Sequence, residues 1–182
     1  EDFKKIRYQA EYLWELVNDV LELSRIESGN MSFHCEDCSA HHFAETVYQT
    51  HQVIILPPVE FIKEFPDEDV TIHIDRMRLT QVITNFLGNA KKFTSQGHIK
   101  LGYFCDKEKK EIHFFVEDTG AGIPKEELQM IFERFYKRNE FVQGVGLGLA
   151  ISKVIVEKMN GHIDVQSEVN KGSRFTAVLP YL

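Results

Sequence analysis

The sequence is poor in cysteine and contains no long apolar run. Its three cysteines, Cys35, Cys38 and Cys105, are too few and odd in number for a disulfide framework, which favours a reducing compartment. No stretch approaches the roughly 18 apolar residues of a spanning helix, and the charged start Glu1-Asp2 is unlike a secretory signal. We therefore expect a soluble, cytoplasmic chain that makes no membrane contact itself.

A basic excess is also missing. The formal net charge is −7, with 28 acidic against 21 basic residues, which opposes the phosphate neutralisation on which nucleic-acid affinity depends. We predict no nucleic-acid partner. Hydrophobic residues make up 43% of the chain and charged residues 27%, so disordered and fibrous classes are excluded, and 182 residues fit one domain with a short appendage.

Residues 1–30 have the pattern of one amphipathic helix. Apolar side chains recur at steps of three and four at Ile6, Ala10, Leu13, Val17 and Val20. Gly29 is a typical stop signal. Because one helix cannot bury such a stripe alone, we expect a partner helix in a hairpin or bundle.

From residue 31 onward, helical and strand patterns alternate. Helices are expected at 40–52, 75–93 and 147–160, with a short one after Pro124, and strands at 31–38, 59–65, 70–74, 98–105, 112–116, 163–166 and 174–179. This mixture predicts an α/β fold with helices layered on one face of a sheet.

The expected helix at 75–93 breaks local rules in its middle. Asn85, Gly88 and Asn89 together cost about 2 kcal/mol relative to Ala, so another role should compensate. Asn85, Asn89 and Lys92 follow one face at steps of four and three. Amide oxygens suit Mg²⁺, and Lys92 suits phosphate. The alternative is a solvated polar face, with Gly88 allowing close helix packing.

A glycine-rich segment, Asp118-Thr119-Gly120-Ala121-Gly122-Ile123, directly follows an expected strand. Its glycines let the backbone approach a flat ligand, and an ionised Asp118 accepts a hydrogen bond from an exocyclic amine such as that of adenine. A tight turn before a helix is the alternative interpretation.

A second glycine cluster, Gly144-Val145-Gly146-Leu147-Gly148-Leu149, opens a helix whose N-terminus can hold phosphate. It is not a Rossmann fingerprint, because position 149 is Leu and the charged stretch 134–143 is unlike a buried strand. The nearby cations Arg134, Lys137 and Arg138 favour anion binding, and the alternative is a solvated loop.

The order of these segments resembles a known family. Asn-x-x-x-Asn-Ala-x-Lys-Phe at 85–93, Asp-x-Gly-x-Gly at 118–122, Phe-x-x-Phe at 132–135, Gly-x-Gly-Leu-Gly-Leu at 144–149 and Gly-Ser-x-Phe-Thr at 172–176 resemble the N, G1, F, G2 and G3 boxes of two-component sensor histidine kinases. The resemblance implies a Bergerat-type two-layer α/β sandwich with a mixed sheet over 31–182, as the catalytic ATP-binding domain. Residues 1–30 resemble the second helix of the dimerisation and phosphoacceptor hairpin.

The resemblance also implies ATP and Mg²⁺ as cofactors and a set of site residues. It implies that Asn89 and Asn85 coordinate Mg²⁺ and that Lys92 contacts phosphate. It further implies that Phe93 stacks on adenine and that Asp118, supported by Thr176, recognises adenine. Further contacts fall to Gly120, Gly122 and Ile123, to a mobile lid of about 135–145 with Phe135 and Arg138, and to its anchor Gly144, Gly146, Leu147, Gly148 and Leu149. Asn85, Asn89 and Lys92 form the implied catalytic set.

The phosphoacceptor histidine of the family is missing from this sequence. None of the eight histidines has the His-Glu/Asp-x-x-Arg-x-Pro setting, so we expect ATP binding without self-modification. The implied partners are a separate phosphoacceptor helix and a response-regulator receiver domain. The implied full-length protein is a homodimeric, membrane-anchored receptor.

Three competing interpretations are disfavoured by particular residues. A gyrase-like ATPase is disfavoured because Asn85 replaces the general-base glutamate, and an amide cannot accept the proton of water at neutral pH. A nucleotide-sensing or degenerate scaffold is disfavoured by the intact glycine boxes. A zinc site at His34-Cys35-x-x-Cys38-x-x-His41-His42 is disfavoured by compressed spacing across an expected strand and helix.

Overall fold

The structure, a computed structural model, describes residues 2–137 and 146–181. Its elements are α1 (Asp2–Glu27), β1 (Glu36–Ser39), α2 (Ala40–Gln52), β2 (Val59–Glu64), β3 (Thr71–Ile74), α3 (Arg76–Phe93), β4 (Gly97–Asp106), β5 (Glu111–Asp118), the 3₁₀ helix η1 (Lys125–Glu127), α4 (Gly148–Lys158), β6 (His162–Glu168) and β7 (Gly172–Pro180). The predicted helices and most predicted strands are present within a few residues of their expected bounds.

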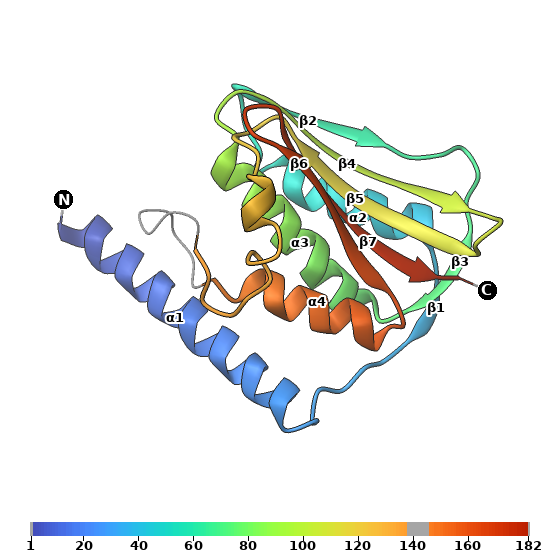
Figure 1. The fold of residues 1–182 in the computed structure, drawn as a ribbon, viewed down its shortest axis with the longest axis horizontal. Helices are drawn as coiled ribbons and strands as arrows, with labels where there is room; N and C mark the ends of the chain where they lie inside the picture. The colour runs from blue at the N-terminus through green and yellow to red at the C-terminus, as the bar shows by residue number, and fades with distance from the viewer. Residues whose placement is uncertain (1, 138–145, 182) are drawn as a thin grey trace.

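Five strands form one mixed sheet in the order β2-β4-β5-β7-β6. β2 is parallel to β4, and the other neighbours are antiparallel. Helices α2, α3 and α4 lie together on one side of this sheet (Figure 1) and contact its strands. The prediction of a two-layer α/β sandwich is therefore confirmed, and a small antiparallel β1-β3 pair lies apart from the main sheet.

The core lies between α3 and the central strands. One face of β4 and β5 and the apolar stripe of α3 are almost fully buried, at Ile99, Leu101, Ile112, Phe114, Leu79, Ile83 and Phe86. α3 starts at Asp75, whose carboxylate accepts a hydrogen bond from the Arg78 N–H at 3.1 Å. Burying the apolar stripe of α3 directs its polar face away from the sheet.

The strand predicted at 31–38 is shorter than expected, and this part of the prediction is wrong. β1 begins only at Glu36, which pairs with Ile74, the last residue of β3. Within the described residues no strand lies opposite the residues before Glu36, and the His34 N–H donates to the Asp75 carboxylate at 2.8 Å instead. In the part of the chain that the structure describes, no cluster of three His, Cys, Asp or Glu side chains could hold a metal.

Helix α1 lies along the α3–α4 side of the molecule (Figure 1). It is joined to α3 by an ion pair between Glu22 and Arg78, whose side chains are 18% and 17% exposed. A second ion pair joins Glu27 to Arg134. The opposite side of α1 exposes large apolar side chains, including Trp14, which is 73% exposed. Over residues 2–137 and 146–181, no helix is long and apolar enough to cross a membrane.

Candidate functional site

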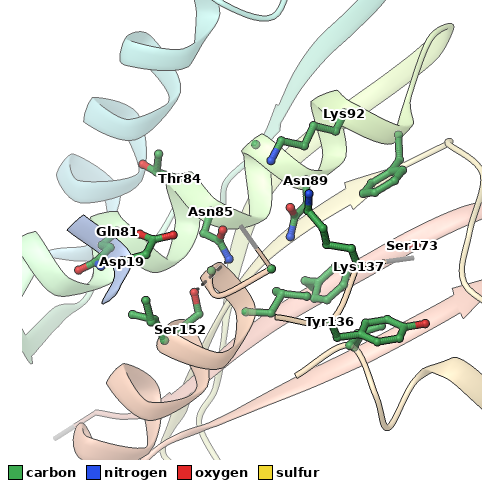
Figure 2. Close-up of a pocket in the computed structure, with 18 of the residues that line it drawn as sticks. Asp19, Gln81, Thr84, Asn85, Asn89, Lys92, Tyr136, Lys137, Ser152 and Ser173 are labelled. Atoms are coloured by element: carbon green, nitrogen blue, oxygen red, sulfur yellow. Dashed lines mark hydrogen bonds between the residues drawn. The ribbon is translucent and has the colours of Figure 1, made fainter. Parts of the chain in front are cut away.

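A cavity of about 680 Å³ lies between α3, α4, the segment after β5 and helix α1 (Figure 2). This volume falls in the range of cofactor and small-molecule sites. Ten of the predicted site residues line it: Asn85, Asn89, Lys92, Phe93, Asp118, Gly122, Ile123, Gly146, Gly148 and Leu149. Segments far apart in the sequence therefore meet at one site.

The polar face of α3 forms one wall of this cavity. Asn85, Asn89 and Lys92 all line it, as their spacing predicts. The Asn85 amide nitrogen donates a hydrogen bond to the Ser152 hydroxyl of α4 at 3.2 Å, which orients this side chain (Figure 2). The wall combines two amides with an amino group, a donor set suited to a metal-bound phosphate.

The other end of the cavity is built around Asp118, the last residue of β5. This carboxylate is buried, with 7% of the residue exposed, and accepts a hydrogen bond from the Gly120 N–H at 2.8 Å. Burial raises the pKa of Asp118, and the Gly120 hydrogen bond offsets part of that rise. Phe93, at the C-terminal end of α3, is partly exposed beside this site and lines the same cavity.

Gly172 allows the close packing of β7 against Asp118. Its φ is +123°, and a Cβ added there would lie 1.8 Å from the Asp118 carbonyl oxygen. No residue with a side chain fits this position without moving β5. Gly172, the first residue of β7, thus fixes the end of β5 that carries the buried carboxylate.

The expected support of Asp118 by Thr176 does not fit the sheet. Thr176 pairs with Phe115 and Ser173 with Asp118, and because side chains alternate along a strand, Thr176 lies on the face away from the cavity. Ser173 is the β7 hydroxyl that lines the cavity beside Asp118. In the sequence, the apolar residues Phe175, Ala177 and Leu179 alternate with the polar residues Arg174 and Thr176. This period of two places Ser173 on the same face as Phe175, and it was the sequence signal for this assignment.

Other predicted residues lie outside the cavity lining. Leu147 is fully buried in the core and Gly120 acts through its hydrogen bond to Asp118. Phe135 is 57% exposed, with a φ of +62°, and is not among the residues that line the cavity. Arg138, Gly144 and most of the expected lid lie outside the described residues.

Several residues that line the cavity were not predicted. These include Glu15 and Asp19 of helix α1. Lys137, one of the three cations expected to favour anion binding, and Tyr136, within the expected lid of 135–145, also line the cavity. Figure 2 shows the amino group of Lys137 directed into the cavity on the side of Asn89. The four-residue spacing of Glu15 and Asp19 places them on one helix face, but nothing local indicates that this face covers α3.

The cavity has an uneven charge distribution. Lys92 and Lys137 bring positive charge to the Asn89 side, and Asp19 and Glu15 bring negative charge from α1. Burial, reinforced by Glu15 and Glu22, raises the pKa of Asp19 to about 6, and Lys92 opposes this rise. The cavity therefore suits a ligand that brings anionic groups together with a cation.

Comparison with known proteins agrees with this geometry. Residues 74–182 match the family described as "Histidine kinase-, DNA gyrase B-, and HSP90-like ATPase". Over 178 residues the chain is 34% identical to sensor histidine kinase WalK of Bacillus subtilis, covering 95% of this chain and 29% of WalK. It is 44% identical over 110 residues to sensor protein SrrB of Staphylococcus aureus, covering 58% of this chain and 19% of SrrB.

Solved structures show the same fold. Full-length ShkA in complex with AMPPNP superposes with a TM-score of 0.87 at 28% identity, covering 98% of this chain and 38% of ShkA. The nucleotide-free catalytic domain of histidine kinase ThkA superposes with a TM-score of 0.72 at 28% identity, covering 83% of this chain and 97% of that domain.

The chain belongs to the histidine kinase, DNA gyrase B and HSP90-like ATPase family. Within this family it is a catalytic ATP-binding domain of the sensor histidine kinase type. It spans less than a third of the length of WalK and SrrB.

Proposed function

We propose that this chain is the Mg-ATP-binding domain of a histidine kinase that transfers the γ-phosphoryl group to a histidine on a phosphoacceptor helix outside this sequence. The phosphoryl group then passes to an aspartate of a response-regulator receiver domain. The observation that carries this proposal is the single cavity that joins the buried Asp118 carboxylate to the Asn85, Asn89 and Lys92 face of α3.

The base end of the cavity suits adenine. An ionised Asp118 accepts a hydrogen bond from the exocyclic amine, and Ser173 lies beside it. Phe93, Gly122 and Ile123 supply the apolar and backbone surface against which a flat ring packs. These contacts position the nucleotide so that its phosphates extend toward α3 and Lys137.

The phosphate end suits a triphosphate with Mg²⁺. Asn89 and Asn85 would hold the cation through amide oxygens, and Lys92 with Lys137 would neutralise phosphate charge. When bound, Mg²⁺ neutralises the charge that develops on the phosphoryl group during transfer. Asn85 accepts no proton from water at neutral pH, which favours transfer to an external acceptor over hydrolysis.

Helix α1 suits the role of one helix in a dimerisation hairpin. Its face away from α3 exposes Phe3, Ile6, Leu13, Trp14, Val17 and Leu21. A stripe of this length needs a cover. In the proposed full-length receptor, which is anchored in a membrane, the other hairpin helix and a second subunit supply that cover.

Calorimetric titration with AMPPNP, with and without Mg²⁺, tests the nucleotide site. We expect Mg²⁺ to tighten binding, and we expect labelled phosphate from ATP to appear on a separately supplied acceptor hairpin. No binding by the folded wild-type chain would contradict the proposal. Binding without transfer to a competent hairpin would instead support a nucleotide-sensing scaffold.

Gly148→Ala is expected to weaken AMPPNP binding in the presence of Mg²⁺ by about 10-fold. This is the typical effect of disturbing a group that orients a metal ligand, here the Asn85 amide. A Cβ at position 148 would lie 2.1 Å from the Asn85 Oδ1 atom, so the Asn85 amide must move. Circular dichroism should show an unchanged fold, because alanine is compatible with the start of α4. Wild-type affinity in this variant would show that Asn85 does not depend on Gly148.

A further inference from the structure

Helix α1 contributes directly to the cavity. Asp19 lies on its cavity-facing side, and Figure 2 shows the Asp19 carboxylate beside Gln81 and directed toward Asn85. Among the residues that the structure describes, Asp19 forms no ion pair and no side-chain hydrogen bond. A carboxylate therefore faces the same space as the two amides that suit Mg²⁺.

The position of Asp19 is set by the docking of α1. Glu22 lies three residues further along, on the same side of the helix, and its ion pair with Arg78 fixes α1 against the start of α3. Both side chains of this pair are mostly shielded from water, where ion pairs are less screened than at an open surface. Asp19 is thus placed by a specific contact between α1 and α3.

The chemistry of Asp19 suits a divalent cation. Carboxylate oxygens are preferred protein ligands of Mg²⁺, which binds one or two carboxylates together with phosphate and water. Without a bound metal ion, Asp19 is repelled by Glu15 and Glu22 of its own helix, with Lys92 of α3 opposing this effect. The incoming phosphates of a nucleotide would add a further repulsion. A cation between Asp19 and α3 removes both repulsions.

We propose that Asp19 binds the Mg²⁺ ion of the nucleotide from the α1 side, directly or through one water, opposite Asn85 and Asn89. This inference rests on the proposed nucleotide site. The metal is then bound by a residue of α1 as well as by residues of the catalytic domain. Mg-nucleotide binding therefore stabilises the docked position of α1.

The test compares wild type with Asp19→Asn, which keeps the shape of the side chain and removes its charge. AMPPNP is titrated with and without Mg²⁺, and the gain from Mg²⁺ is taken as the ratio of the two Kd values. We expect this gain to fall by about 10-fold in the variant, the size typical for loss of a group that supports a metal. Without Mg²⁺, the variant should bind AMPPNP at least as well as wild type.

A direct metal measurement separates the cation from the nucleotide. At saturating AMPPNP, free Mn²⁺ is followed by electron paramagnetic resonance, and Asp19→Asn should lower Mn²⁺ affinity by about 10-fold. The control is Glu11→Gln, which removes the same charge from α1 at a site exposed to solvent and outside the cavity lining. Its Mn²⁺ affinity should match that of wild type.

Two results would overturn the inference. One is an unchanged gain from Mg²⁺ in Asp19→Asn while wild type still binds in a Mg²⁺-dependent way, which leaves the nucleotide site intact. If that unchanged gain came with equally tighter AMPPNP binding in both conditions, Asp19 would only repel phosphate. The other result is an Mn²⁺ affinity in Asp19→Asn that equals that of wild type. A wild type that binds no AMPPNP would reject the proposed function together with this inference.

Discussion

Asp118→Asn is expected to weaken AMPPNP binding by about 100-fold. The variant loses the charge-assisted hydrogen bond from the exocyclic amine of adenine, and the NH₂ group of the new asparagine can face that amine as a second donor. The same change should raise the melting temperature at neutral pH. Both effects have one cause, because the buried carboxylate that suits adenine is costly to the folded protein when it is ionised. The Asn oxygen still accepts the Gly120 hydrogen bond.

The stability effect of Asp118→Asn should depend on pH in a defined direction. Because the pKa of Asp118 is raised above its ordinary value of 3.8, the folded state holds its proton to higher pH than the unfolded state. Ionisation therefore begins to destabilise the fold as pH rises above 3.8, and the cost is constant above the folded pKa. The stability advantage of the variant should therefore grow as the pH rises above 3.8 and disappear in acid.

Thermal melts from acid to neutral pH, with AMPPNP titrations at neutral pH, check this prediction. Asp164→Asn is the matched control, because Asp164 lies exposed on β6 and outside the cavity lining. It should leave affinity unchanged. A variant at position 118 that binds AMPPNP as wild type does would remove Asp118 from the adenine site.

Asn89→Ala is expected to remove most of the gain in AMPPNP affinity that Mg²⁺ provides, on the order of 10- to 100-fold. The change deletes an amide oxygen from the cavity wall and leaves α3 intact, since alanine favours helix more than asparagine does. Binding without Mg²⁺ should change little, because Lys92 and Asp118 remain.

Calorimetry with and without Mg²⁺ measures this gain, and Asn18→Ala is the control. Asn18 is an exposed helical asparagine of α1 outside the cavity lining, so the gain from Mg²⁺ should be unchanged. If Asn89→Ala kept the full gain, the cation would not be held by Asn89. The proposed positions of Asn85 and Asp19 around the cation, which are defined relative to Asn89, would then be unsupported.

Local patterns in the sequence were sufficient to predict α3 and its functional face. The apolar stripe of Leu79, Ile83 and Phe86 sets the helix period, and the same period places Asn85 and Asn89 on another side. The β4–β5 hairpin was predictable for the same reason, because its alternation and its charged turn are contiguous. Such features depend on neighbours a few residues apart.

Features that depend on tertiary contacts could not be predicted in this way. The start of β1 is set by the end of β3 and by the Asp75 carboxylate, about 40 residues away in sequence, as the His34 to Asp75 separation shows. The presence of Asp19 in the cavity depends on the docking of α1 against Arg78. The expectation for Thr176 came from the motif resemblance, whereas the sheet register pairs Ser173 with Asp118 and strand alternation turns Thr176 to the other face.

The position of β5 within the sheet gives the two ends of the cavity different local stabilities. β5 has hydrogen-bonded neighbours on both sides, β4 and β7, so exposing the backbone around Asp118 requires opening the centre of the sheet. α1 is joined to the other end through side-chain contacts such as Glu22 with Arg78. Amide exchange should therefore be slowest in β5 and much faster in α1. Helix α1 can therefore separate from a bound ligand through a local opening of low free energy, while β5, which carries Asp118, keeps its hydrogen bonds to β4 and β7.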